Sequence, residues 1–187
     1  IRFISDEIYH GITYDRRADT AAALSEDAVI INSFSKYFSM TGWRLGWMVV
    51  PEDLARAVES LAQNLFISPP TLSQIAAVAA FDCREELEAN VARYAANRAL
   101  LLDQLPQAGF PDLAPADGAF SIYADVGHLT NDSQEFCARI LRETGVAVTP
   151  GVDFDPERGN RFLRFSFAGT TEEIAAGAQA LKDWRVG

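Results

Sequence analysis

The sequence predicts an α/β fold made of two lobes joined by a long helix. Three short apolar stretches come first and are followed by two helical patterns, an order typical of an α/β lobe. A long helical pattern over residues 84–105 then precedes a second alternation of strand, helix, strand, strand and helix. We therefore expect each lobe to contain a sheet with helices packed on it.

The strands of the first lobe are predicted from stretches rich in β-branched and aromatic residues. Each has the length of a buried strand and is bounded by turn residues, and the three cover residues 2–4, 28–34 and 44–50. Trp43 and Trp47 are expected to pack in the core. Because residues 1–5 resemble the middle of a strand and the first residue is not Met, we expect the natural chain to begin before Ile1.

Two helices are predicted after these strands. Pro51 suits the first turn of a helix over residues 51–66. The apolar residues on one face of this helix are Leu54, Val58, Leu61 and Leu65. Pro69 and Pro70 interrupt the pattern, so a second helix is predicted from about residue 71 to 81.

The second lobe begins after Pro106, where a loop is expected over residues 109–115. Asp132 or Ser133 can cap a helix that ends at Gly145, and Thr170–Thr171 with Glu172–Glu173 resembles the capping arrangement of a last helix. The predicted elements are a strand at 119–126, a helix at 133–144, strands at 146–149 and 162–167, and a helix at 171–184.

Composition argues against several classes of protein. The net charge of −10 disfavours nucleic-acid binding, and no apolar run approaches the roughly 18 residues that a membrane helix needs. Cys83 and Cys137 are far apart and form no CxxC pair, which predicts idle thiols in a reducing, cytoplasmic compartment. His10 and His128 have no neighbouring ligand cluster, so no metal site is predicted.

The densest chemical signal is the segment NSFSK, which is followed by TGWRLG. A strand is predicted to end near Ser33, and Lys36 and Arg44 follow it. Ligands of open α/β sheets tend to bind beyond the carboxyl ends of strands, where a lysine can form a Schiff base and an arginine can grip a phosphate. Taken alone, a lysine after a strand is usually a solvated surface residue, so the interpretation depends on Ser33, Lys36 and Arg44 together.

A second polar motif follows the first predicted strand in the segment SDEIY. Asp6 can pair with a pyridinium nitrogen and keep it protonated, and Tyr9 can donate a hydrogen bond to a phenolate oxygen. The alternative interpretation is a turn-capping aspartate and a packed tyrosine.

The pairing of SDEIY with SFSKYFSMTGWRLGW closely resembles the class I and II aminotransferases, which are fold-type I pyridoxal-phosphate enzymes. The segments GAF at 118–120, VTPGVDF at 148–154 and FLRFSFA at 162–168 also resemble segments of that family, in the family's order. The resemblance implies a fold in which residues 1–84 are the carboxyl-terminal part of a large domain with a mostly parallel sheet. Residues 85–187, including the connecting helix, would be a small α/β domain.

The resemblance also implies a role for each motif residue. Lys36 would hold pyridoxal 5'-phosphate covalently and move the proton between the substrate α-carbon and cofactor C4′. Asp6 would bind the pyridinium nitrogen and Tyr9 the ring oxygen, while Ser33 and Arg44 would bind the phosphate. Arg164 would pair with the substrate carboxylate. Arg161 is expected at the surface, and Phe120 either lines the pocket or only packs.

The function implied is transfer of an amino group from an amino acid to a 2-oxo acid by a homodimer. Family members are about twice this long, so we expect these residues to lack part of the cofactor site and to be inactive alone. Residues 68–71 lie near the dimer interface or are a simple linker. Two other functions stay open. One is a carbon–sulfur β-lyase, which uses the same lysine and aspartate, and the other is a non-catalytic aminotransferase-like sensing domain of a transcription regulator.

Overall fold

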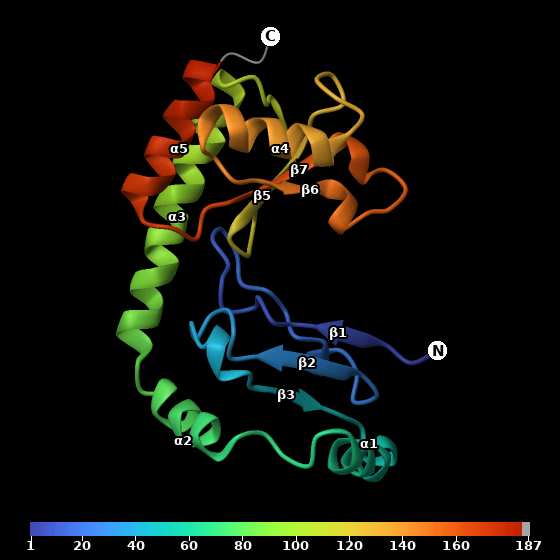
Figure 1. The fold of residues 1–187 in the computed structure, drawn as a ribbon. Helices are drawn as coiled ribbons and strands as arrows, with labels where there is room; N and C mark the ends of the chain where they lie inside the picture. The colour runs from blue at the N-terminus through green and yellow to red at the C-terminus, as the bar shows by residue number, and fades with distance from the viewer. Residues whose placement is uncertain (185–187) are drawn as a thin grey trace. The chain divides into compact units, whose positions relative to one another are not determined.

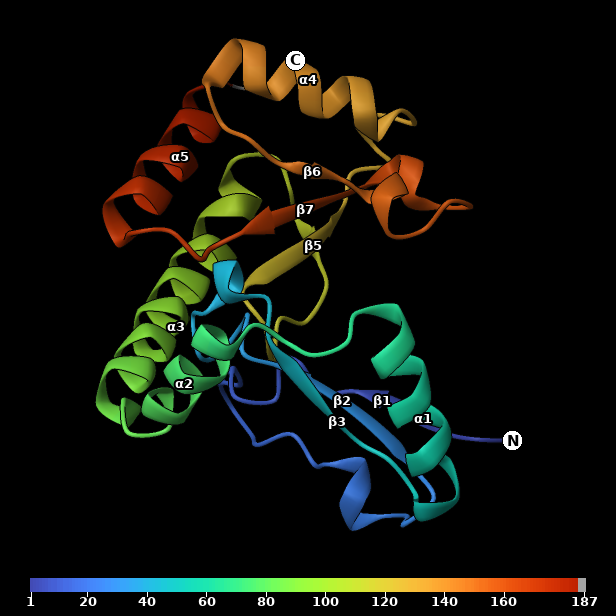
Figure 2. The same ribbon diagram turned by 60° about the horizontal axis from the view of Figure 1, so that its bottom comes forward.

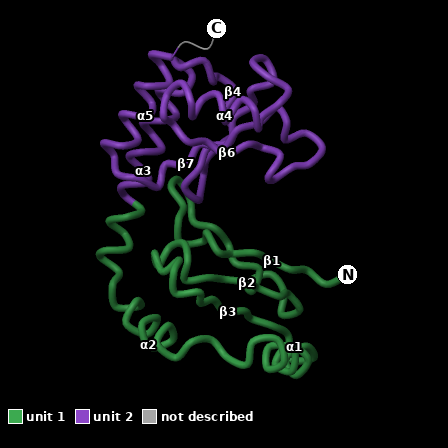
Figure 3. Tube along the Cα trace, in the orientation of Figure 1, with its two compact units in different colours: residues 1–91 green, residues 92–187 purple. Residues whose placement is uncertain are grey.

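The computed structural model describes residues 1–184 and divides the chain into two compact units, Ile1–Val91 and Ala92–Gly187 (Figure 3). The division falls inside α3, the helix Arg84–Gln107. Each unit has its own sheet, and both mix helices with strands, so the α/β prediction is confirmed (Figure 1). The boundary after residue 84 that the resemblance implies stays a prediction.

Unit 1 contains a three-stranded sheet in the order β1-β2-β3. Its strands are β1 (Ile4–Asp6), β2 (Val29–Ser33) and β3 (Gly46–Val49), and they run side by side in Figure 2. β1 and β2 are parallel, whereas β3 is antiparallel to β2. The third strand begins two residues later than predicted because Arg44 adopts a left-handed backbone conformation, with φ of 52°, which is incompatible with a strand.

The helices of unit 1 agree closely with the sequence. They are α1 (Glu52–Leu65) and α2 (Thr71–Ala80), with short 3-10 helices η1 (Ala21–Ala23) and η2 (Thr41–Trp43) that the sequence did not predict. A small core joins the loop after β2 to α2, and its buried members are Phe34, Met40, Ala77 and Ala80. An edge-on contact between the Phe34 and Phe81 rings, with centroids 5.7 Å apart, extends this core to the end of α2.

The expectation that Trp43 and Trp47 lie in the core is wrong. Their side chains are 46% and 38% exposed. Trp47 belongs to β3, an edge strand whose four residues are all exposed, and its ring contacts Phe34 with centroids 4.9 Å apart. Aromatic composition predicts burial on average. Trp43 instead lies in the exposed 3-10 turn before β3, and Trp47 lies on a strand whose residues are exposed on both faces within residues 1–184.

Unit 2 contains an antiparallel four-stranded sheet in the order β4-β5-β7-β6. The strands are β4 (Asp112–Leu113), β5 (Ser121–Asp125), β6 (Thr149–Pro150) and β7 (Phe162–Ser166). β4 lies in the segment predicted to be a loop, and β6 is shorter than the strand predicted at 146–149 and shares only Thr149 with it. Buried residues alternate along β5 and β7, so one face of the sheet forms the core and the other carries Tyr123 and Arg164.

The helices of unit 2 are α4 (Ser133–Thr144) and α5 (Thr171–Trp184), with 3-10 helices η3 (Gly151–Asp153) and η4 (Gly159–Arg161). Asp132 caps α4 by accepting the Glu135 N–H at 3.1 Å, and Gly145 ends it with φ of 76°. At α5, Thr170 and Glu173 accept each other's backbone N–H, which confirms the predicted capping box.

The long helix α3 continues two residues beyond its predicted end and includes Pro106. Asn97, which is fully buried, donates its amide to the carbonyls of Phe167 and Gly169 at 3.0 and 3.1 Å. This bond pair fixes the chain that leaves β7 against α3. Among residues 1–184, no helix combines the length and the apolar character needed to cross a membrane.

Candidate active site

Three strand ends meet at one edge of the sheet in unit 1. Because β1 and β2 are parallel and β3 is antiparallel to β2, the carboxyl ends of the first two strands lie beside the amino end of the third. Asp6 ends β1, and Ser33 ends β2, where it pairs with Gly46 at the start of β3. This edge therefore brings together the two motifs, which are 27 residues apart from Asp6 to Ser33 in sequence.

Lys36 lies on a tight loop between β2 and η2 that is anchored at both ends. Phe34 and Met40 are buried, and the Met40 N–H donates to the Phe34 carbonyl at 2.9 Å. Ser39, with φ of 55°, donates its N–H to the Lys36 carbonyl at 3.1 Å. The Lys36 Nζ lies 5.4 Å from the centroid of the Tyr9 ring. The lysine of one motif is thus next to the tyrosine of the other, and a cation is attracted to an aromatic face.

Arg44 follows η2 in the left-handed backbone region, which non-glycine residues seldom adopt and which recurs at functional sites. Its guanidinium Nη1 donates to the Thr41 carbonyl at 2.9 Å, and the side chain is exposed. The Thr41 hydroxyl donates to the Ser35 carbonyl at 2.8 Å, and the Ser35 N–H donates to Ser33 Oγ at 3.0 Å. The segment 33–44 thus carries a guanidinium, hydroxyls and an ammonium, which are the donors that bind a phosphate.

The turn after β1 carries two acidic residues in different environments. Asp6 is exposed, and its Oδ1 accepts the Ile8 N–H at 3.3 Å. Glu7 is only 3% exposed, and its Oε1 accepts the Ala21 N–H at 2.8 Å while Oε2 lies 3.2 Å from His10 Nδ1. Successive side chains of an extended chain point to opposite sides, which separates the two carboxylates.

The Glu7 carboxyl is ionised despite its burial. Desolvation raises its pKa, but the hydrogen bonds from the Ala21 backbone and from the hydroxyls of Thr20 and Ser5, with the charge of His10, hold the pKa below its usual value. Glu7 was not among the predicted site residues. The only available signal was its position next to Asp6 at the end of a strand, and a charged residue there is more often solvated.

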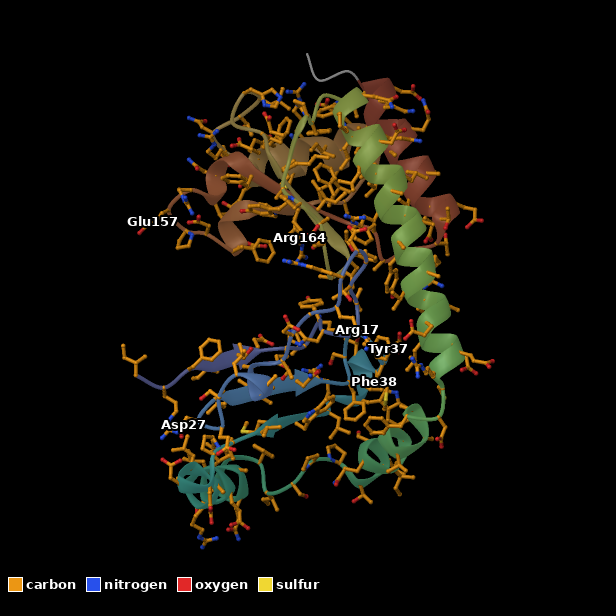
Figure 4. The ribbon with its side chains drawn as sticks, turned by 180° about the vertical axis from the view of Figure 1, so that it is seen from behind. Arg17, Asp27, Tyr37, Phe38, Glu157 and Arg164 are labelled. Atoms are coloured by element: carbon orange, nitrogen blue, oxygen red, sulfur yellow. The ribbon has the colours of Figure 1, made fainter. Side chains whose placement is uncertain are left out.

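Tyr37, directly after Lys36, connects the lysine loop to two other segments of unit 1 (Figure 4). Its hydroxyl donates to Glu88 of α3 at 2.6 Å. Its ring lies against Gly11, where an added Cβ would approach the ring to 2.4 Å, so only glycine fits without a shift. Burial, together with the hydrogen bond to Glu88, raises the pKa of Tyr37 to about 12.

Arg164 lies at the middle of β7 in unit 2, on the face of the sheet opposite the core (Figure 4). Its register partners are Tyr123 on β5 and Thr149 on β6. Nη2 donates to Thr149 Oγ1 at 3.2 Å, and the guanidinium carbon lies 4.6 Å from the centroid of the Phe154 ring. Within residues 1–184 the buried Nε has no hydrogen-bond partner. Thr149 and Phe154 therefore hold the guanidinium in one place, and a guanidinium fixed in this way can bind a carboxylate with two parallel hydrogen bonds.

Two neighbouring residues have simpler environments. Arg161 forms a two-bond ion pair with Asp125, with contacts of 2.7 and 3.1 Å, and is about half exposed, consistent with its expected surface position. The Phe120 ring packs against Tyr94 of α3, with centroids 5.9 Å apart. Packing accounts for Phe120, and its second possible role in lining a pocket stays a prediction.

Comparison with known proteins places this arrangement in context. Residues 1–181 match the family model described as aminotransferase class I and II. The chain is 52% identical to the valine–pyruvate aminotransferase of Mycobacterium tuberculosis, over 98% of this chain and 48% of that protein. It is 36% identical to the (5-formylfuran-3-yl)methyl phosphate transaminase of Methanocaldococcus jannaschii, over 97% of this chain and 49% of that protein.

A solved structure gives the same result. The crystal structure of an aminotransferase from Mycobacterium tuberculosis superposes with a TM-score of 0.96 at 51% sequence identity, covering 99% of this chain and 49% of that one. The chain thus spans about half the length of the relatives it matches.

Proposed function

This chain belongs to the class I and II aminotransferases, and from that premise we propose that the whole protein transfers an amino group from an amino acid to a 2-oxo acid, with pyridoxal 5'-phosphate as cofactor. The observation that carries the proposal is the convergence of Asp6, Tyr9, Ser33, Lys36 and Arg44 at one edge of the sheet in unit 1. Bound pyridoxal phosphate supplies an electron sink for the bonds of the substrate α-carbon.

Each residue at the edge has a role in this proposal. The Lys36 amine would hold the cofactor covalently and would move the proton between the substrate α-carbon and cofactor C4′. The Asp6 carboxylate pairs with the ring nitrogen and keeps it protonated. The Tyr9 hydroxyl donates to the ring oxygen. The donor set of Ser33 and Arg44 fits the phosphate.

Arg164 is proposed to bind the α-carboxylate of the amino acid and of the 2-oxo acid. Its unpaired Nε and the contacts with Thr149 and Phe154 support this role, because a guanidinium fixed by its neighbours binds a carboxylate with less loss of side-chain entropy. Valine with pyruvate is the first donor and acceptor pair to test, since the relative at 52% identity carries that name. We also propose that the whole protein is a homodimer.

Borohydride reduction of the full-length protein with its cofactor, followed by peptide mapping, tests the central assignment. These 187 residues contain only two lysines, Lys36 and Lys182, so the label has few possible positions in them. We expect the phosphopyridoxyl group on the Lys36 peptide. The Lys36→Arg variant should lose the label, and Lys182→Arg, altered in the last turn of α5, should keep it. A label elsewhere, or none, would overturn the proposal.

A second measurement separates transamination from β-elimination. Adding an amino donor should convert the cofactor spectrum to that of the pyridoxamine form without release of pyruvate and ammonia from the donor. The relatives described above carry aminotransferase and transaminase names, which does not favour the lyase or the sensing-domain alternative.

A further inference from the structure

Glu7 is the one charged residue among residues 1–184 that is less than 9% exposed. Burying a carboxylate is costly unless hydrogen bonds and opposite charges compensate, and a neutral side chain of the same size would often give equal or better stability. Its position beside Asp6, at the edge of the sheet that carries Lys36, therefore calls for a reason other than packing.

The Glu7 carboxylate connects the end of β1 to a segment 14 residues later in the chain. Its Oε1 accepts the backbone N–H of Ala21, the first residue of η1, at 2.8 Å. The hydroxyls of Thr20 and Ser5 also donate to it, and His10 Nδ1 lies 3.2 Å from Oε2. The carboxylate thus contacts both Ser5, which lies within β1, and the segment Thr20–Ala21 at the start of η1.

The same turn is fixed by its own backbone. Its first residue extends the sheet, because the Glu7 N–H donates to the Ile31 carbonyl at 2.8 Å. Next, the His10 N–H donates to the Glu7 carbonyl at 3.0 Å, and the N–H of Ile12, a fully buried residue, donates to the Tyr9 carbonyl at 2.8 Å. A shift of the Glu7 carboxylate would therefore move the backbone that carries Tyr9.

The other side of the turn meets the lysine loop. Gly11 packs against the ring of Tyr37, and the Tyr9 ring lies 5.4 Å from Lys36 Nζ. The turn is consequently held between the Glu7 contacts on one side and the lysine loop on the other. The turn carries Asp6, at the end of β1, and Tyr9, whose ring lies next to Lys36.

We propose that Glu7 is a positioning residue: its buried carboxylate fixes the turn that carries Asp6 and Tyr9, and so sets how these two side chains meet the cofactor ring. The inference rests on the function proposed above. Glu7 does not touch the reacting atoms, and it acts through the backbone of residues 6–12.

Two variants of the full-length protein test the inference, with Glu26→Gln as the matched control because Glu26 is an exposed glutamate of the same unit. Glu7→Ala removes every contact of the carboxylate. Glu7→Gln keeps an acceptor for the Ala21 N–H but loses the charge opposite His10. Thermal midpoints of the cofactor-free proteins report folding, and the visible absorbance of the cofactor-loaded proteins reports the site.

We expect Glu7→Ala to weaken pyridoxal-phosphate binding by about tenfold, the usual scale for a displaced hydrogen bond in a site. The pH midpoint of the visible absorbance should rise by roughly half a unit or more. A withdrawn Tyr9 hydroxyl leaves more negative charge on the ring oxygen, and this charge holds the proton on the neighbouring Lys36 nitrogen more tightly. Glu7→Gln should show the same changes with smaller size, and Glu26→Gln should match the wild type.

The outcomes separate the two proposals. Glu7 variants that have a lower thermal midpoint but the wild-type pH midpoint and cofactor affinity would assign Glu7 to fold stability alone and overturn the inference. If Glu7→Ala does not fold, Glu7→Gln decides by the same two readouts. A wild-type protein that binds no pyridoxal phosphate would instead overturn the proposed function, and the inference with it.

Discussion

At the scale of single residues, the environment of Arg164 restricts what it can bind. Thr149 and Phe154 contact the guanidinium from two directions, and the buried Nε is left as a donor. A planar guanidinium can offer two parallel hydrogen bonds to a carboxylate, whereas an ammonium cannot. The position therefore distinguishes arginine from lysine although both carry a positive charge.

Arg164→Lys should raise the KM for the amino donor by about 10- to 100-fold, because one of two charge-assisted hydrogen bonds is lost. Steady-state kinetics of the full-length protein with valine and pyruvate measure the change. Cofactor affinity should stay at the wild-type value. Arg161→Lys, three residues away and paired with Asp125 at the surface, is the control and should keep the wild-type KM. An equal rise in both variants would remove Arg164 from the carboxylate site.

Tyr37 predicts a specific dependence of stability on pH. Burial and Glu88 raise its pKa from 10.0 to about 12, so the folded state favours the protonated phenol. This contribution is complete below pH 10 and is lost as the pH rises through about 12. Tyr37→Phe should lower the free energy of unfolding by about 1 kcal/mol at neutral pH, since it removes one hydrogen bond.

The difference between the wild type and Tyr37→Phe should shrink between pH 10 and 12, the window set by the two pKa values. Urea denaturation at a series of pH values measures it. A difference that stays constant over this range would show that the Glu88 contact does not stabilise the folded state.

At the scale of elements, replacing glycine with alanine should have opposite effects on the stability of the protein at two positions of unit 2. Gly177 lies inside α5 and lines a cavity of about 120 Å³, and an added Cβ would meet Val146 at an ordinary 3.8 Å. Gly177→Ala should therefore stabilise the protein by about 1 kcal/mol, the usual gain of alanine over glycine in a helix. Thermal denaturation checks this, and an unchanged or lower midpoint would contradict it.

Gly159 is the matched contrast. An added Cβ there would lie 2.3 Å from the backbone of Gly151, which cannot yield as a flexible side chain can. Gly159→Ala should destabilise the protein by about 2 kcal/mol or more, because η3 and η4 must separate. A neutral effect would mean that the two short helices are not tightly joined.

At the scale of the whole molecule, unit 1 leaves a large apolar surface uncovered within residues 1–184. α2 and the residue that follows it expose a stripe of four apolar residues, spaced three apart in sequence. They are Leu72, Ile75, Val78 and Phe81, and each is more than 60% exposed. Patches of this kind mark interfaces or cause aggregation. The chain spans about half the length of the relatives it matches.

The 187-residue chain produced alone should therefore self-associate and bind a hydrophobic dye. Replacing Leu72, Ile75 and Val78 with serine should reduce both, because it removes most of the exposed stripe. Sedimentation velocity and dye fluorescence measure the outcome. Replacing exposed polar residues of the same unit, such as Glu59 and Gln63, with alanine is the control and should not reduce either. A monomeric chain that binds no dye would contradict the prediction.

The sequence by itself determined the α-helices, the α/β class and the family. Periodic apolar residues and caps are local signals, and they located α1, α2, α4 and α5 to within about two residues. The motifs around Asp6 and Lys36 were also readable, because fixed spacings of chemically distinctive residues survive in a linear pattern. Their roles in binding the cofactor stay proposals.

Only the tertiary structure decided how those motifs meet. The pairing of β1 with β2 and of β2 with β3 put Asp6, Ser33 and the start of β3 at one edge, and brought Lys36 to the Tyr9 ring. It also revealed the burial of Glu7 and the exposure of Trp47, neither of which residue type predicts. The physical reason is that burial and strand pairing depend on contacts between residues distant in sequence, whereas helices and caps depend on near neighbours.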